Sequence, residues 1–491
     1  MIVRGLNCPT LSVISDSMSV SCSVSALMYH LLFLLLVPVL CLKDTEDCHG
    51  YDCLKAYVER EEPAYKWRDL GHRLEVPDYQ DVGGWTGYVL NFTSQQWLSP
   101  DIVDKSEWWH IMLIIIPNHL AVTDTSILWI TGGSNNIEDD GQVDLADEEV
   151  LLLSDIAVSN GMVASVLFHI PNQPIVFSED VLQDRRKEDG IIAFTWWHFM
   201  NDEAEDAEYL LRLPMTKGAV KAMDTVTNFL TSDTAPEELQ ALGLNPSQFL
   251  VGGASKRGWT TWTTSVVDPR VIAILPVVMD ELNFIENIKH HYRSYGGWSF
   301  ALEDYWVLNL TTYFDNPKMQ KLFDIVDAFE HRDKMLMPKY VINAGNDEFF
   351  LPTDTGYWWD RMPSYNELNR FILLPNTEHS MVTGLLGGKI LTKKKYNLQS
   401  STLLEVIPSV NAWISQILFA DRILKKKYGG QRPEVRSIED RNRASLELMS
   451  VADVPRFNWT TDPETGDITV RSEVRPVGVH VWHASTCTSV I

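Results

Sequence analysis

Residues 248–262 read QFLVGGASKRGWTTW and carry the strongest structural signal in the chain. An apolar strand leads into small residues and Ser255, and a predicted helix follows. A serine at such a strand-to-helix turn adopts a strained backbone conformation, with its hydroxyl above the sheet edge. Small neighbours let the strand and the helix approach closely. The turn therefore marks Ser255 as a candidate nucleophile, and the alternative is a glycine-rich turn with a capping serine.

The turn departs from the usual nucleophile pentapeptide by one position. That pattern places a glycine two residues after the serine. This chain has Arg257 there, and its glycine follows at Gly258. The turn by itself therefore leaves both interpretations of Ser255 open.

From about residue 105 the chain alternates short apolar runs with helical patterns. Buried strands that alternate with helices are typical of an α/β fold with a mainly parallel sheet. We expect further strands at residues 108–116, 126–131, 163–170, 271–279, 339–343 and 370–374.

An acid and a histidine follow the serine in the order that α/β-hydrolases require. Asp347 comes just after the predicted strand 339–343, and His379 comes just after 370–374. Open α/β sheets place their sites beyond the carboxyl ends of such strands. We therefore predict that His379 accepts the proton of Ser255 and that Asp347 orients the imidazole.

The same mechanism needs backbone N–H groups that bind an oxyanion. One is expected from Lys256, directly after the nucleophile, and the other from a loop after an early strand. Gly132-Gly133-Ser134-Asn135 occupies that place, so Gly133 and Ser134 are the candidates. An ordinary turn at the end of a strand is the alternative.

Four regions are expected along the chain. Residues 1–42 form a signal peptide or an N-terminal anchor, and residues 43–104 form an extension packed on the core. Residues 105–430 form the α/β-hydrolase-like domain, with a helical cap insertion at about 281–335 that is rich in aromatic residues. Residues 431–491 form a small β-rich appendage with strands at 467–474 and 477–482.

The N-terminal region bears on the compartment. Residues 31–42 (LLFLLLVPVLCL) are continuously apolar, which is too short to span a bilayer and fits the apolar region of a signal peptide. We therefore expect a secreted chain that begins after residue 42, with a membrane anchor as the alternative. Asn91, Asn309 and Asn458 each stand in a glycosylation sequon, and glycans are expected at the first two.

The cysteines allow one local disulfide in an oxidising compartment. Cys48 and Cys53 frame a short loop, and the alternative is two unpaired thiols. No cysteine lies between residues 54 and 486. The main body is therefore neither a disulfide scaffold nor a cysteine-ligated metal domain.

Charge and motifs exclude several classes of function. The chain of 491 residues has 66 acidic and 41 basic residues, a net charge of −25. Such a balance argues against nucleic-acid binding, which needs clustered Lys and Arg. Neither a GxxxxGK[ST] nor a GxGxxG motif is present, so no nucleotide cofactor is expected. His290 and His291 are adjacent and lack a suitably spaced third ligand, so no metal is expected.

Four stretches together resemble the PhoPQ-activated pathogenicity-related protein family, which includes the autocrine proliferation repressor proteins. They are VGGASKRGWTTW (251–262), VVDPRVIAILPVVMDELN (266–283), NAGNDEFFLPTDT (343–355) and LPNTEHS (374–380). The resemblance covers roughly residues 50–485. It implies an α/β-hydrolase-like core with Ser255, Asp347 and His379 as the triad.

The family is associated with bacterial virulence regulation and with secreted growth-repressing signals, and membership implies no agreed substrate. The family's C-terminal β region normally continues past residues 479–484. The appendage of this chain is therefore expected to be incomplete.

Two functions follow as hypotheses. The first is a secreted serine hydrolase that cleaves a small-molecule or peptide ester or amide through an acyl-Ser255 intermediate. The second is a non-enzymatic secreted signalling protein that keeps the hydrolase fold and acts on a cell-surface receptor. Neither needs a nucleic acid, a cofactor or a stable membrane span in the mature chain.

Overall fold

The computed structural model describes the chain from residue 48 onward, with gaps. The described residues are 48–78, 83–135, 141–362, 369–374, 377–381, 419, 423, 457–462, 465, 468–472 and 475. The expected signal peptide or anchor at 1–42 and the expected strand at 477–482 lie outside them. No helix of this described part is long and apolar enough to cross a membrane.

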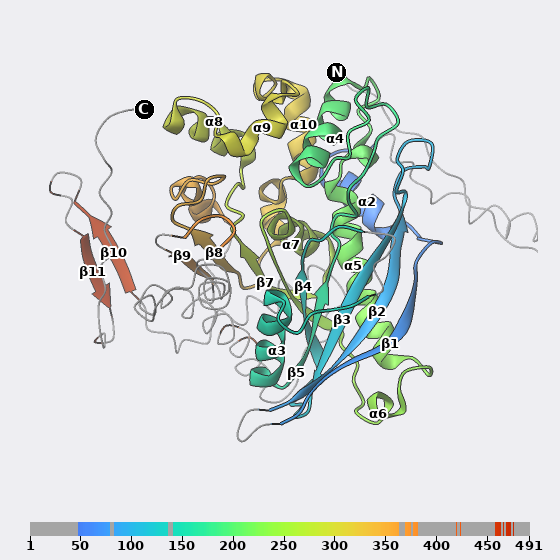
Figure 1. The fold of residues 1–491 in the computed structure, drawn as a ribbon. Helices are drawn as coiled ribbons and strands as arrows, with labels where there is room; N and C mark the ends of the chain where they lie inside the picture. Colours follow the sequence, from blue (N-terminus) through green and yellow to red (C-terminus); the bar gives the residue numbers. More distant parts are fainter. Residues whose placement is uncertain are drawn as a thin grey trace, which may run out of the picture. The chain divides into compact units, whose positions relative to one another are not determined.

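Within the described residues, nine strands form one sheet in the order β1-β2-β3-β5-β4-β6-β7-β8-β9 (Figure 1). The pairs β1–β2, β2–β3 and β3–β5 are antiparallel. The pairs β5–β4, β4–β6, β6–β7, β7–β8 and β8–β9 are parallel. This mainly parallel sheet confirms the predicted α/β class. The strands are β1 (Lys66–Val76), β2 (Trp85–Gln96), β3 (Glu107–Pro117), β4 (Val122–Ile130), β5 (Met162–Leu167), β6 (Gln248–Ala254), β7 (Val271–Val277), β8 (Tyr340–Ala344) and β9 (Arg370–Leu374).

The region 43–104 builds part of this sheet. Its strands β1 and β2 pair with each other, and β2 pairs with β3 along its whole length. The region therefore forms two strands of the sheet itself, whereas the sequence predicts an extension that packs on the core. Ahead of β1 lies α2 (Tyr51–Glu59), and a disulfide joins Cys48 to Cys53 at the start of that helix.

Alternate side chains of the strands enter two separate hydrophobic layers, as a period of two requires. In β3, Met112 and Ile114 belong to the layer shared with α2, α5 (Arg212–Thr231) and α7 (Lys256–Val267). Ile111 and Leu113 face the opposite layer, which contains the apolar side chains of α3 (Glu148–Asn160). The sheet is therefore buried on both faces, as a parallel sheet requires.

A helical insertion connects β7 to β8, as predicted for the cap, and its helices group together in Figure 1. It consists of α8 (Phe284–Tyr295), η4 (Phe300–Leu302), α9 (Glu303–Trp306), η5 (Leu310–Thr312), α10 (Pro317–Val326) and η6 (Ala328–Lys334). We call this segment the cap. The remaining described helices are α4 (Asp189–Asn201), η3 (Ala207–Tyr209), α6 (Glu237–Gln240), η7 (Asp354–Tyr357) and η8 (Trp359–Arg361).

The C-terminal appendage contains one described hairpin. Strands β10 (Phe457–Thr461) and β11 (Ile468–Ser472) pair antiparallel in a sheet of their own. The second strand matches the expected strand at 467–474. The sheet order, the strand-to-helix turn at Ser255 and the helical insertion together define an α/β-hydrolase-like fold.

Candidate active site

Ser255 stands between the end of β6 and the first residue of α7 in a strained conformation. Its backbone angles are φ 55° and ψ −124°, a region that costs a non-glycine residue about 1–3 kcal/mol. Two backbone hydrogen bonds hold this conformation: the Ser255 N–H donates to Val277 O at 2.8 Å, and the Trp259 N–H donates to Ser255 O at 3.0 Å. The predicted strained turn at the serine is therefore present.

Glycines on both sides of the turn allow the close approach that it needs. A Cβ on Gly253 would lie 2.9 Å from the backbone oxygens of Ile130 and Arg257. One on Gly258 would lie 3.0 Å from Val277 O and 2.9 Å from the Cβ of Met279. Gly258 thus provides the close helix–strand contact, although it stands one position later than in the usual pentapeptide.

The structure brings Ser255, His379 and Asp347 together in the predicted order. His379 Nε2 lies 2.7 Å from Ser255 Oγ. On the other side of the ring, His379 Nδ1 lies 2.8 and 2.9 Å from the two carboxylate oxygens of Asp347. The three residues follow β6, β9 and β8 respectively, so the parallel part of the sheet delivers them to one edge.

The backbone fixes the Asp347 carboxylate, which is 5% exposed. Its Oδ1 accepts hydrogen bonds from the N–H groups of Phe349 at 2.8 Å and Phe350 at 3.0 Å. The rings of these two phenylalanines also pack on the imidazole of His379, with centroids 4.5 and 5.4 Å away. Glu348 points elsewhere and accepts the backbone N–H of His379 at 3.1 Å. Asp347, not its acidic neighbour, therefore contacts the imidazole.

The predicted oxyanion loop leaves the sheet beside the serine. β4 and β6 are parallel neighbours, and Ile130 pairs with Gly253 in their register. The loop that carries Gly133 and Ser134 therefore starts next to the Ser255 turn. Gly133 has φ 113°, and a Cβ there would meet the His169 ring at 2.9 Å, so this position requires glycine.

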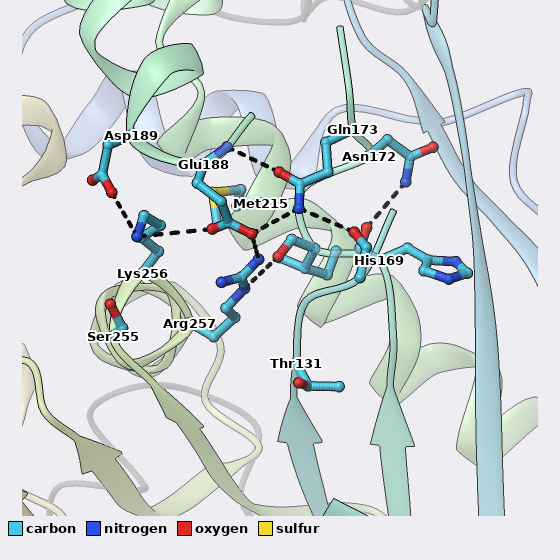
Figure 2. Close-up of polar contacts among 12 residues, drawn as sticks. Thr131, His169, Asn172, Gln173, Glu188, Asp189, Met215, Ser255, Lys256 and Arg257 are labelled. Atoms are coloured by element: carbon cyan, nitrogen blue, oxygen red, sulfur yellow. Dashed lines mark hydrogen bonds and ion pairs between the residues drawn. The ribbon is translucent and has the colours of Figure 1, made fainter. Parts of the chain in front are cut away.

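The side chains of Lys256 and Arg257 anchor the Ser255 turn to the start of α4 (Figure 2). Lys256 Nζ lies 2.7 Å from Asp189 and 3.8 Å from Glu188. Arg257 Nη2 lies 2.7 Å from Glu188, and its Nε donates to the carbonyl of Ile170 at 2.6 Å. Burial by itself would raise the pKa of Glu188, but the charges of Arg257 and Lys256, with hydrogen bonds, lower it. Glu188 is therefore ionised near neutral pH.

A pocket of about 560 Å³, a volume that includes solvent at its mouth, opens beside Ser255. Side chains of the core line part of this pocket, and side chains of the cap form one wall of it. The lining residues are Asp189, Ile192, Trp196, Ser255, Lys256, Trp259, Met279, Glu281, Phe284, Ile288, Leu302, Tyr305, Thr311, Phe314, Phe349 and Phe350. Ser255 thus has an adjoining space for part of a ligand.

Sequence reasoning missed Glu188, Asp189 and Glu281 at this site. Glu188 and Arg257 are 69 positions apart, and no motif of regular spacing links an acid to a base over such a distance. Glu281 lies within MDELN, one of the stretches that carries the family resemblance, but the sequence does not show which of its two acids faces the pocket.

Hydrogen-bond geometry defines what the arrangement can do chemically. In a neutral imidazole with its proton on Nδ1, that N–H donates to Asp347 and Nε2 accepts from the hydroxyl of Ser255. A serine held in this way can transfer its proton as it attacks an electrophile.

Several solved structures are similar to this chain. An acetyl xylan esterase from Paenibacillus sp. R4 matches with a TM-score of 0.42 and 14% identity over 67% of this chain and 87% of that one. A glucuronoyl esterase from Solibacter usitatus matches with a TM-score of 0.40 and 12% identity over 77% of this chain and 89% of that one.

The sequence comparisons are closer. Autocrine proliferation repressor protein A of Dictyostelium discoideum is 40% identical over 333 residues, which are 67% of this chain. The chain spans 61% of the length of that relative. The model of the PhoPQ-activated pathogenicity-related protein family matches residues 54–401, which include Ser255, Asp347 and His379. The chain therefore belongs to the PhoPQ-activated pathogenicity-related protein family.

Proposed function

We propose that this protein is a serine hydrolase that cleaves an ester or an amide through an acyl-Ser255 intermediate. The observation that carries the proposal is the hydrogen-bonded series from Ser255 Oγ through His379 to Asp347, at 2.7 and 2.8 Å. This series starts at a strained turn and lies beside a pocket. A solvated surface serine needs neither feature.

Each residue has a defined role in the proposed reaction. Ser255 Oγ attacks the carbonyl carbon while His379 Nε2 takes the hydroxyl proton, and Asp347 stabilises the resulting imidazolium. The carbonyl oxygen becomes an oxyanion that the N–H groups of Lys256 and of Gly133 or Ser134 would bind. When the tetrahedral intermediate collapses, His379 returns the proton to the departing alcohol or amine. Water then attacks the acyl-serine with His379 again as the base, and this step releases the acid and regenerates Ser255.

A fluorophosphonate probe tests the proposal directly, because it bonds covalently to an activated serine. We expect the purified protein to be labelled and the label to map to the peptide that contains Ser255. Ser255→Ala should abolish labelling, and His379→Ala should slow it severely. A wild-type protein that stays unlabelled while folded would refute the hydrolase proposal.

One observation favours a second function. The relative that is 40% identical is named as an autocrine proliferation repressor. The alternative is therefore that this chain is a secreted growth-repressing signal that keeps the fold without turnover and binds a cell-surface receptor. Conditioned medium that represses proliferation equally with wild-type protein and with a folded Ser255→Ala variant would favour this alternative.

We also propose that the protein is secreted. The Cys48–Cys53 disulfide fits an oxidising compartment, and the apolar run at 31–42 fits a signal peptide. The sequon residue Asn309 is exposed on the cap, so it is accessible as an acceptor. A membrane anchor formed by residues 1–42 is the alternative, and fractionation of expressing cells separates the two.

A further inference from the structure

We propose that Glu281 makes the Ser255 pocket selective for substrates that carry an ammonium group. This inference rests on the proposed hydrolase function, because it specifies which part of an ester or amide the pocket binds. It starts from one side chain that lines the pocket and that the triad chemistry does not use.

Glu281 is a buried acid that contacts no partner among the described residues. It is 6% exposed and lines the pocket. Among the described residues, no hydrogen-bond donor or cation contacts its carboxyl group. A buried carboxyl that lacks partners is costly. A ligand that brings a donor or a positive charge to the pocket wall would offset this cost.

The neighbouring buried acids differ from Glu281 in this respect. Asp280 accepts hydrogen bonds from Thr355 Oγ1 at 2.6 Å and Trp358 Nε1 at 2.8 Å. Asp327 accepts the backbone N–H groups of Phe284 at 2.8 Å and Phe329 at 2.9 Å. The chain therefore supplies hydrogen-bond donors to Asp280 and Asp327. Of these three acids, Glu281 is the one that an incoming group could contact.

The charges around Glu281 favour a cation. Burial raises its pKa well above the usual value, and the nearby acids Asp354, Asp327, Asp189 and Asp347 raise it further. Both causes favour a positive partner, either a proton or a cationic group, at the Glu281 carboxyl. The pocket's own cation, Lys256, already lies 2.7 Å from Asp189.

An ammonium group can neutralise the Glu281 carboxylate without adding net charge to the pocket. A protonated Glu281 releases its proton to solvent on binding, and the ammonium takes the position opposite the carboxylate. One positive charge replaces another, so the buried site stays neutral. An anionic substrate would instead place a second negative charge beside the Glu281 carboxyl, which disfavours it.

The pocket walls suit the same ligand. Aromatic side chains line the space, among them Trp196, Trp259, Phe284 and Phe314. Arg212 already lies over the Trp259 ring, and Phe284 stacks on Trp259 and Phe323. The walls therefore offer mainly apolar surface, which would hold the hydrocarbon part of an amine.

Kinetics with matched esters test the inference. The p-nitrophenyl esters of straight-chain ω-amino acids are compared with those of fatty acids that have the same number of heavy atoms. We expect the best amino ester to exceed its fatty counterpart in kcat/KM by about 30-fold, the scale of a lost buried charge partner. Glu281→Gln should bring this ratio close to one. Glu286→Gln, on the exposed side of α8, is the matched control and should keep the ratio.

Binding without turnover separates this inference from the hydrolase proposal. Phenethylamine should raise the melting temperature of the wild type and of Ser255→Ala, whereas phenethyl alcohol should not, and Glu281→Gln should lose the response. If this pattern appears while the fluorophosphonate fails to label Ser255, the hydrolase proposal falls and the ammonium site stands. Equal responses to amine and alcohol, or an amine response that persists in Glu281→Gln, would overturn the ammonium site.

Discussion

Arg257 and Glu188 meet at 2.7 Å although 69 positions separate them in the chain. Their contact joins the first turn of α7, directly after Ser255, to the residue that precedes α4. Gly132 makes room for it, since a Cβ there would lie 2.5 Å from Arg257 Nη2. An arginine in place of the usual glycine therefore acts as a brace for the Ser255 turn.

The first prediction concerns this brace. Arg257→Met should lower stability by about 1–3 kcal/mol, because Glu188 and the Ile170 carbonyl lose a charged donor. It should also slow fluorophosphonate labelling, since the strained turn is held less firmly. Urea unfolding and labelling rates measure both effects. The double variant Glu188→Gln/Arg257→Met should lose less than the sum of the two single variants, and strict additivity would contradict the brace.

The second prediction concerns the triad. Ser255→Ala and His379→Ala should each remove nearly all turnover, and the double variant should lose little more, because the members act as a unit. Asp347→Asn should reduce kcat by about 10⁴-fold, since the amide favours the wrong tautomer. Glu348→Gln should be mild, because an amide oxygen can still accept the backbone N–H of His379. If Glu348→Gln lowers turnover more than Asp347→Asn does, then Glu348 and not Asp347 is the acid of the triad.

The third prediction concerns the displaced glycine. Gly258→Ala should destabilise the fold by about 1–3 kcal/mol, as overpacking does, because the new Cβ would meet Val277 O and Met279. Gly297→Ala is the matched control, since nothing lies within 4 Å of a Cβ there. Thermal unfolding of the two variants makes the comparison. Equal melting temperatures would show that the helix–strand contact at Gly258 can relax.

The fourth prediction concerns pH. Burial, with the charge of Asp280 as the next cause, raises the pKa of Asp354 to about 8. Between the unfolded value of about 4 and this folded value, the native state binds more protons, so stability falls as pH rises. His290 Nε2 lies 3.9 Å from Asp354 Oδ1. Burial lowers the pKa of His290, so its imidazole offers little positive charge to stabilise an ionised Asp354.

Asp354→Asn should therefore raise the melting temperature at pH 8 more than at pH 5. The Asn oxygen can still accept the N–H of Leu351, which donates to Asp354 at 2.7 Å. Melting curves of both proteins across this range give the answer. A variant as pH-sensitive as the wild type would show that Asp354 titrates normally.

The fifth prediction concerns secretion. Mass spectrometry of protein from its native source should find a chain that begins after residue 42 and a glycan on Asn309. Asn91 is the less accessible acceptor, because it lies half-buried in β2, next to the buried residues Phe92 and Thr93. An intact N-terminus with unmodified asparagines in a cytosolic fraction would refute secretion.

The sequence predicted the sheet after residue 105 well, because buried parallel strands are short apolar runs between helices. It assigned β1 and β2 less completely. β1 is an edge strand with no fully buried residue, so it lacks the continuous apolar run that marks its inner neighbours. A polar edge strand and an extended surface segment have nearly the same composition.

Among the site residues, Ser255, Asp347 and His379 could be found because chain order and strand ends restrict where they stand. The brace at Arg257 and the pocket position of Glu281 depend on how α4 and the cap pack against α7. These contacts join segments that no local pattern connects. Only the three-dimensional arrangement distinguishes Glu281, which faces the pocket, from Asp280, which is bonded to Thr355 and Trp358.

The parallel pairing of β7 with β8 sets a lower limit on the length of the cap. Chain that leaves β7 at one edge of the sheet must return to the opposite edge before β8 can begin, and such a crossover needs about a dozen residues or more. Relatives can therefore shorten, lengthen or exchange this insertion, but none can reduce it to a hairpin turn. The sheet thus permits variation in the cap and at the same time guarantees that some chain always passes beside the strand next to β6.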